Sequence, residues 1–109
     1  MGFDFDRAYY RLVYPIALRP GFRVGGRVVP VVDLSEQGAR LLFTEPPYPE
    51  LGADLVGLIG LPGGESISAE GRVVRVDAPF VCLNLTRGVP FGVMLEQQRF
   101  LQHRLAAWR

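Results

Sequence analysis

Two groups of residues in the first part of the chain have types and spacings that suit the binding of a polar ligand. Arg7 and Arg11 form an R-x-x-x-R pair, and Asp33, Ser35 and Gly38 follow as a D-x-S-x-x-G segment at the end of an apolar run. A guanidinium is a planar fork of hydrogen-bond donors that suits phosphates, guanine edges and stacking. A carboxylate adds acceptors, and a hydroxyl adds both a donor and an acceptor. These groups indicate recognition rather than bond breaking.

Each pattern alone also has a plain structural interpretation. R-x-x-x-R pairs arise by chance in an arginine-rich chain, and two more occur at Arg19/Arg23 and Arg23/Arg27. A D-x-S-x-x-G segment is typical of a turn in which Asp and Ser bond to nearby backbone N–H groups and the glycine adopts a positive φ. The two patterns therefore carry weight only in combination and in a suitable fold.

The other polar residues do not form the pattern of an enzyme. Catalysis needs a nucleophile with a base, paired carboxylates or a metal. Cys82 lies in an apolar run and is expected to be a buried, inert thiol. His103, the single histidine, is expected on the solvent side of the last helix, and zinc needs three or four protein ligands. The sequence predicts no catalytic residues, no metal site and no cofactor.

The composition predicts one small domain in a reducing compartment. Of the 109 residues, 49% are hydrophobic, which is enough for one core but not for two. One cysteine allows no internal disulfide, the first residues do not resemble a signal peptide, and no run reaches the roughly 20 apolar residues of a membrane span. All 12 basic residues are arginine, yet the net charge is only +1, which argues against tight binding to long nucleic acids. We therefore expect a cytoplasmic protein that binds neither nucleic acid nor membrane.

Frequent prolines and glycines predict many short strands. The strand-like segments are residues 12–18, 22–24, 28–34, 39–43, 54–61, 67–76, 80–85 and 91–95. Gly25-Gly26 fits a two-residue hairpin turn, and the apolar spacing of the tail predicts a closing amphipathic helix over 96–108. The expected fold is all-β with a C-terminal helix, as a six- or seven-stranded antiparallel barrel or sandwich. A flexible, arginine-bearing arm (1–11) would precede this single domain (12–109).

Apolar residues in these segments mark the expected core. The aromatic residues expected to be buried are Phe43, Phe80 and Phe91. The stripe of the helix expected to pack on the barrel consists of Leu101, Leu105 and Trp108. The proline-rich segment 46–49 is expected to be an extended connector.

Taken together, the arginine pair and the D-x-S-x-x-G segment resemble the PilZ family. Residues 11–15 (RLVYP) are similar to that family's entry into its first strand, and residues 31–35 (VVDLS) to its second strand. Residues 38–41 (GARL) are similar to the start of its third strand, and residues 91–93 (FGV) to the strand before its last helix. The resemblance covers nearly the whole chain and implies a six-stranded antiparallel split barrel.

PilZ domains bind the bacterial second messenger cyclic di-GMP, so the resemblance implies a role for each motif residue. Arg7 and Arg11 would clamp the ligand, because a guanidinium can meet O6 and N7 of guanine, pair with a phosphate or stack on a base. Asp33 would accept the N1–H and N2–H₂ donors of guanine. Ser35 would bond guanine or phosphate, and Gly38 would let the backbone approach the ligand. The implied protein is a non-catalytic cyclic di-GMP receptor.

The resemblance also gives the N-terminal arm a role. Ligand binding would order residues 1–11, at roughly 1–2 kcal/mol per fixed residue, and would thereby change contacts with an effector protein. Asp6 stands before the first motif arginine, where many family members have a basic residue, and this acid favours one bound ligand over a stacked pair. Tyr9 and Tyr10 are expected to pack against the barrel.

Two alternative functions stay open. One is a PilZ-fold adaptor that works through protein contacts with weak or no nucleotide binding. The other is an oligonucleotide-binding barrel, which would stack exposed aromatic residues along a basic groove, whereas the aromatic residues here lie in apolar runs. The sequence leaves the pathway open, with motility and biofilm formation as those the family implies, and leaves open a monomer or a weak homodimer.

Overall fold

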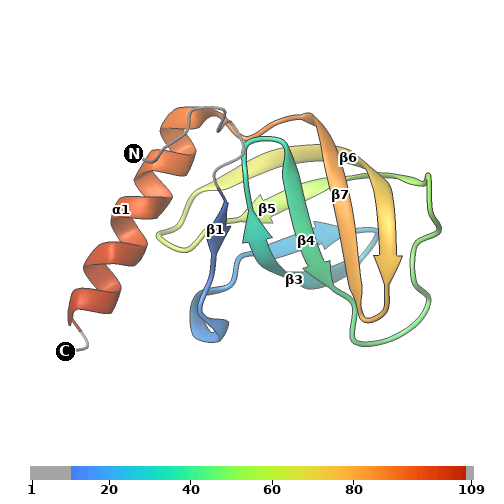
Figure 1. Cartoon of the computed structure of the whole chain (residues 1–109), viewed down its shortest axis with the longest axis horizontal. Helices are drawn as coiled ribbons and strands as arrows, with labels where there is room; N and C mark the ends of the chain where they lie inside the picture. Colours follow the sequence, from blue (N-terminus) through green and yellow to red (C-terminus); the bar gives the residue numbers. More distant parts are fainter. Residues whose placement is uncertain (1–10, 108–109) are drawn as a thin grey trace.

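A closed antiparallel barrel makes up most of the computed structural model, which describes residues 11–107 (Figure 1). The elements are β1 (Leu12–Val13), the 3₁₀ helix η2 (Ile16–Leu18), β2 (Gly21–Val24), β3 (Arg27–Leu34), β4 (Gly38–Leu42), β5 (Asp54–Gly60), β6 (Ser66–Asp77), β7 (Phe80–Arg87) and α1 (Phe91–Ala107). The strands form one sheet of order β1-β3-β2-β5-β6-β7-β4, and β3 also pairs with β4. This last pairing closes β2 to β7 into a six-stranded barrel with β1 added on β3. The prediction of an antiparallel β-barrel with a C-terminal helix is confirmed.

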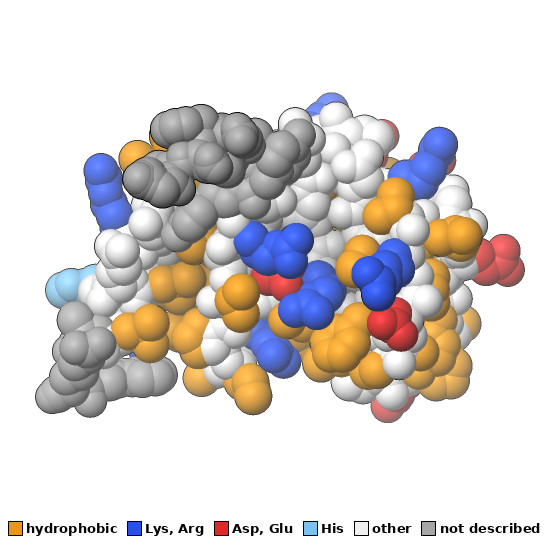
Figure 2. Space-filling view, viewed as in Figure 1, with side chains coloured by type: hydrophobic (Ala, Val, Ile, Leu, Met, Phe, Trp, Pro, Cys, Tyr) orange, Lys and Arg blue, Asp and Glu red, His pale blue; other side chains and the backbone are white. Residues whose placement is uncertain are grey.

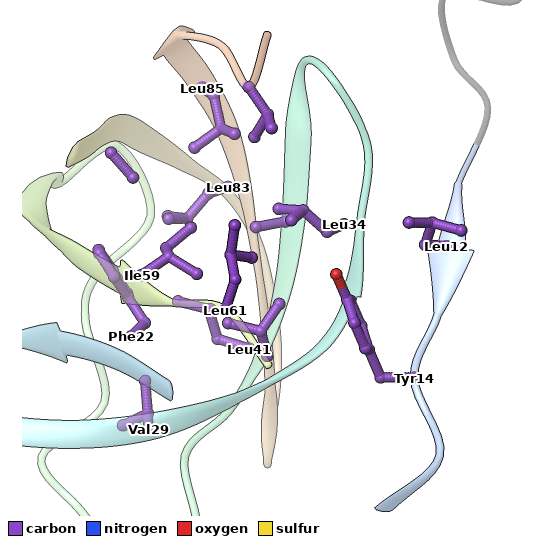
Figure 3. Packing of buried hydrophobic residues seen from close by; sticks show 14 of the residues in the cluster. Leu12, Tyr14, Phe22, Val29, Leu34, Leu41, Ile59, Leu61, Leu83 and Leu85 are labelled. Carbon is purple, nitrogen blue, oxygen red and sulfur yellow. The ribbon is translucent and has the colours of Figure 1, made fainter. Parts of the chain in front are cut away.

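Apolar side chains that alternate with outward-facing polar ones fill the barrel. Along β6, Ala69 and Val73 are buried, while the polar residues between and beside them are exposed. Alternation of this kind follows from the two-residue period of a strand. Phe22, Leu41 and Ile59, from three further strands, converge with them in the interior (Figure 3). The burial of this apolar surface gives the outer face of the barrel a rigid base.

The predicted two-residue hairpin turn joins β2 to β3. Gly25 has φ 54° and Gly26 has φ 82°. The favoured two-residue hairpin turn requires positive φ at both central positions, which glycine adopts without steric cost. The turn therefore fixes the start of β3, the strand that ends at the D-x-S-x-x-G segment.

The first strand-like run is shorter than the sequence predicted. Within this run only Leu12–Val13 (β1) forms a strand, which pairs with β3, and Tyr14 adds one further bond from its N–H to the carbonyl of Val32 (3.0 Å). Pro15 follows, and proline has no N–H with which to continue a ladder. The chain then turns, and the N–H of Leu18 donates to the carbonyl of Pro15 (2.9 Å). The expected strand 12–18 is thus a two-residue strand followed by a 3₁₀ turn.

The last predicted strand, 91–95, is helical, and α1 begins earlier than the expected residue 96. Pro90 suits the start of a helix because its missing N–H would have no partner there. Its carbonyl accepts the N–H groups of Val93 (3.0 Å) and Met94 (3.1 Å). Phe91 is 64% exposed, so the expectation that it lies in the core was wrong. A short apolar run does not distinguish a strand from a first helical turn.

The helix α1 contacts the barrel through a buried polar side chain. The Tyr14 hydroxyl donates to Oε1 of Gln97 (2.7 Å), and Nε2 of Gln97 donates to the carbonyl of Pro62 (3.0 Å). Leu12 and Tyr14 point from the β1 segment toward Leu34 of β3 (Figure 3). Burial raises the pKa of the Tyr14 hydroxyl above its usual value, because desolvation disfavours the phenolate. Gln97 thereby ties the helix to the segment that follows Arg11.

The apolar stripe of α1 is only partly buried. Leu101 is buried as expected, whereas Leu105 is exposed, and Trp108 lies outside the described residues. Within residues 11–107, no helix is both long and apolar enough to cross a membrane.

The proline-rich connector between β4 and β5 is held by one arginine. Nη1 and Nη2 of Arg27 donate to the carbonyls of Pro47 (2.8 Å) and Glu45 (2.7 Å). The same guanidinium lies over the ring of Phe43, 5.0 Å from its centroid. Phe43 is buried as predicted, whereas Phe80 is only half-buried. The side chain of Arg27 therefore fixes the position of the connector that contains residues 46–49.

Candidate ligand-binding site

Strand pairing brings the two parts of the sequence pattern together. Asp33 lies near the end of β3, Ser35 lies in the turn that follows, and Gly38 begins β4. Arg11 directly precedes β1, whose Val13 lies opposite Asp33. Because β1 pairs with the end of β3, the guanidinium of Arg11 reaches the carboxylate of Asp33, with Nε 3.8 Å from Oδ1. Arg7, the other predicted arginine, lies outside the described residues, as do Asp6 and the rest of the arm.

Asp33 is a buried carboxylate between two arginines. The residue is only 4% exposed. Nε of Arg40 donates to Oδ2 of Asp33 (2.9 Å), while Arg11 approaches Oδ1. On the face that β4 and β7 present, several arginine side chains gather with an acidic group between them (Figure 2). A buried carboxylate is costly unless positive charge or hydrogen-bond donors satisfy it, and here two guanidinium groups do so.

Arg40 is a functional candidate that sequence reasoning missed. It lies directly opposite Asp33 in the β3–β4 pair, and directly opposite residues of an antiparallel pair interact on the same face. Its guanidinium also lies over the ring of Phe80, 5.2 Å from the centroid. The sequence did contain one signal for Arg40: it is a charged residue on the polar face of the strand that follows the D-x-S-x-x-G segment. The register that places Arg40 on Asp33 includes a bulge between Val31 and Asp33, which spacing alone does not reveal.

The turn between β3 and β4 differs from the simple turn that its sequence suggested. The carbonyl of Gly38 accepts the N–H of Ser35 (2.9 Å) and, at 3.4 Å, its hydroxyl. Gly38 is a strand residue opposite Asn84 and is not among the described glycines with positive φ. A Cβ at this position would meet the Leu83 carbonyl at 3.4 Å and the Ser35 hydroxyl at 3.5 Å. The described protein could accommodate these ordinary contacts, so it does not itself require glycine at residue 38.

The β7 side of the barrel holds this turn by its backbone. The N–H of Leu85 donates to the carbonyl of Gln37 (2.8 Å), and the N–H of Val89 donates to the carbonyl of Glu36 (2.8 Å). Gly88 permits the second bond, because a Cβ there would overlap the Glu36 carbonyl. Backbone bonds from the β7 side therefore fix the conformation of residues 35–38.

A polar groove of about 420 Å³ adjoins the turn. Its lining comes from the turn, from the end of β7 and from the start of α1, and consists of Glu36, Gln37, Asn84, Leu85, Thr86, Gly88, Val89, Pro90 and Phe91. Glu36 and Gln37 belong to both the groove and the D-x-S-x-x-G segment. The groove thus continues the surface that the segment presents.

Cys82 and His103 carry the single thiol and the single imidazole of the chain. Cys82 is half-buried on β7 rather than fully buried as expected, and His103 is exposed on α1 as expected. Between Arg11 and Ala107, no three His, Cys, Asp or Glu side chains come together in a way that could hold a metal ion. The site thus consists of two arginines around one carboxylate, beside the turn that carries the Ser35 hydroxyl. Guanidinium groups are suited to bind negatively charged groups, and a carboxylate oxygen accepts hydrogen bonds.

The fold is a small antiparallel β-barrel, and its surface carries two arginines around one buried carboxylate. The sequence matches the PilZ domain family over residues 5–99, and the chain belongs to this family. PilZ domains are cyclic di-GMP receptors or adaptors of the same fold, and they are typically non-catalytic.

Two solved structures share the fold at low sequence identity. The inhibitor of motility MotI/DgrA of Bacillus subtilis aligns with a TM-score of 0.68 and 15% identity, over 97% of this chain and 54% of its own. An uncharacterized Legionella protein, Lpg0364, aligns with a TM-score of 0.60 and 16% identity, over 88% of this chain and 98% of its own. The chain thus spans about half the length of MotI/DgrA. No curated protein shows a significant sequence match.

We expect Gly88→Ala to loosen the turn that presents Ser35. The added methyl group must displace the Glu36 carbonyl, and overpacking of this kind costs roughly 1–3 kcal/mol. Urea unfolding should show that loss, and amide exchange at Val89, which donates to Glu36, should accelerate. The matched control is Gly92→Ala, where nothing lies within 4 Å of the new Cβ and the helix gains up to about 1 kcal/mol. Unchanged stability and exchange in Gly88→Ala would show that the close approach does not hold the turn.

Proposed function

We propose that this protein is a non-catalytic receptor of cyclic di-GMP that binds the ligand with Arg7, Arg11, Asp33, Ser35 and Gly38. Membership of the PilZ family supports this proposal. The observation that carries it is the approach of Arg11 Nε to within 3.8 Å of Asp33 Oδ1. Two motifs that are distant in sequence meet at one point of the surface, as a shared ligand site requires.

The chemistry of the ligand matches the groups that meet there. Cyclic di-GMP carries two phosphates and two guanines. The guanidinium of Arg11, with a 63% exposed side chain, is accessible to a phosphate or to O6 and N7 of a guanine. The carboxylate of Asp33 is suited to the N1–H and N2–H₂ donors of guanine. The hydroxyl of Ser35 and the backbone at Gly38 would line the same side of the ligand.

Arm ordering on ligand binding, followed by altered contact with a partner protein, completes the proposed mechanism. Residues 1–10 lie outside the described structure, so the support for this step is their sequence, with its charged and aromatic residues and Arg7. Within the described residues, Tyr14 connects the end of this segment to Gln97 of α1. A change around Arg11 would therefore reach the helix across only a few residues.

The partner and pathway belong to the same proposal. MotI/DgrA, which shares the fold, is described as an inhibitor of motility. Control of motility from the cytoplasm is accordingly the first role to test, with biofilm formation as the second. A partner protein would receive the signal, and the receptor itself would perform no reaction.

A PilZ-fold adaptor with weak or no nucleotide binding is the second candidate function. One observation favours it: both oxygens of Asp33 already face arginines, Oδ2 at 2.9 Å and Oδ1 at 3.8 Å. A site satisfied by its own residues could serve protein contacts without a ligand. The two functions differ in whether cyclic di-GMP can replace Arg11 at the carboxylate.

Calorimetric titration with cyclic di-GMP separates these functions. We expect the wild-type chain to bind, and Arg11→Ala and Asp33→Asn each to weaken binding about 5- to 150-fold, since one good guanidinium or carboxylate contact to a base is worth roughly 1–3 kcal/mol. Matched controls are Arg23→Ala on β2 and Asp54→Asn on β5, both exposed residues outside the motifs; they should bind as the wild type does. Absence of heat and of any shift in melting temperature for the wild type would favour the adaptor. Retained affinity in both motif variants would place the ligand elsewhere.

Hydrogen exchange tests the arm. We expect amide exchange across residues 1–12 to slow when the ligand is added, because ordering the segment protects its N–H groups. The strands β5 and β6, which carry no motif residue, serve as an internal reference and should not change. Equal exchange rates in residues 1–12 with and without saturating ligand would contradict the ordering of the arm. That result would not contradict the proposed binding site.

A further inference from the structure

Arg40 holds Asp33 more closely than Arg11 does, although Arg40 belongs to neither motif. Nε of Arg40 makes a hydrogen bond to Oδ2 at 2.9 Å, within the range of strong charge-assisted bonds. Nε of Arg11 is 3.8 Å from Oδ1, a distance for an ion pair and not for a hydrogen bond. The two arginines thus contact different oxygens of one carboxylate, and the contact of Arg40 is the shorter one.

The surroundings of the two arginines also hold Arg40 more firmly than Arg11. Arg40 lies on β4, which pairs with β3 on one side and with β7 on the other, and its guanidinium is stacked over Phe80. Its side chain is 40% exposed. Arg11 precedes a two-residue strand that pairs only with β3, and its side chain is 63% exposed. Arg40 is therefore the fixed counter-ion of Asp33, and Arg11 the exchangeable one.

We propose that Arg40 is a positioning residue of the cyclic di-GMP site, which orients Asp33 so that the 2-amino edge of guanine replaces Arg11 at Oδ1. This inference rests on the proposed function. In the free protein, Arg11 shields Oδ1. When the ligand binds, Arg11 moves to a phosphate or to the O6/N7 edge of guanine, and N1–H and N2–H₂ take its place.

The burial of Asp33 makes Arg40 necessary for this exchange. Asp33, a residue that is only 4% exposed, cannot lose all the positive neighbours of its carboxylate without a large desolvation cost. Because Arg40 remains at Oδ2, Asp33 keeps a counter-ion when Arg11 leaves. Without Arg40, the carboxylate would turn toward Arg11 as its remaining counter-ion and would no longer present Oδ1 to guanine. Arg40 thereby determines which edge of the base Asp33 can read.

The test compares two ligands that differ in one group. Cyclic di-IMP has hypoxanthine in place of guanine and so lacks the 2-amino donor, while its phosphates and its O6/N7 edge are the same. The ratio of its Kd to the Kd of cyclic di-GMP reports the contact between Asp33 and the 2-amino group. Loss of general stability at the site would weaken both ligands and would leave this ratio unchanged.

Arg40→Gln and Arg40→Lys are the informative variants. Lysine keeps the positive charge but cannot reproduce the planar guanidinium fork on Oδ2 or its stacking on Phe80, and it provides a second variant should the uncharged one fail to fold. Arg23→Gln, an exposed arginine on β2, is the control. A melting curve for each protein verifies folding before titration.

We expect the wild type and Arg23→Gln to prefer cyclic di-GMP at least about fivefold, in line with one hydrogen-bonding edge worth roughly 1–3 kcal/mol. In both Arg40 variants the ratio should fall toward one. A folded Arg40 variant that keeps the wild-type ratio, whether its affinity is unchanged or uniformly lower, would overturn the role of Arg40. Failure of the wild type to bind either ligand would instead refute the proposed receptor function, and this inference with it.

Discussion

The carboxylate of Asp33 sits at the end of β3 almost without contact to water, and the rest of the site is arranged around that charge. Such a group destabilises the fold unless positive charge or donors face it. Arg40 approaches it from β4 at 2.9 Å, and Arg11 approaches it from the chain before β1 at 3.8 Å. Both strands pair with β3 at Asp33. One ionic group therefore connects the closure of the barrel, the added strand and the end of the N-terminal arm.

The barrel makes this arrangement persistent. Its apolar interior fixes β3 and β4, and the pairing of these two strands closes the sheet. The turn between them is held from behind by two backbone bonds that involve Glu36 and Gln37. On the other side, Tyr14 and Gln97 tie the segment after Arg11 to α1. A ligand that drew Arg11 away would thus act on a connection to the helix while the barrel remained intact.

Local patterns in the sequence predicted the antiparallel barrel and the C-terminal helix, and the two motifs predicted that Arg11 would lie close to Asp33. The two glycines at 25 and 26 predicted the hairpin turn, because glycine adopts the required positive φ without steric cost. The helical start at Phe91 was missed, because a short apolar run after a proline fits either element. Arg40 was missed for a different reason: its role depends on a cross-strand register with a bulge near Asp33. Pairing across strands is a tertiary property that residue spacing does not encode directly.

A crystal structure of the complex with cyclic di-GMP would test the exchange at Asp33 through two distances to its carboxylate oxygens. We expect Nε of Arg40 to remain within hydrogen-bond distance of Oδ2, while Arg11 contacts the ligand and a guanine N1–H or N2–H₂ group lies on Oδ1. A complex in which the ligand is bound but Arg11 and Arg40 both keep their present places on Asp33, with no base at Oδ1, would contradict it.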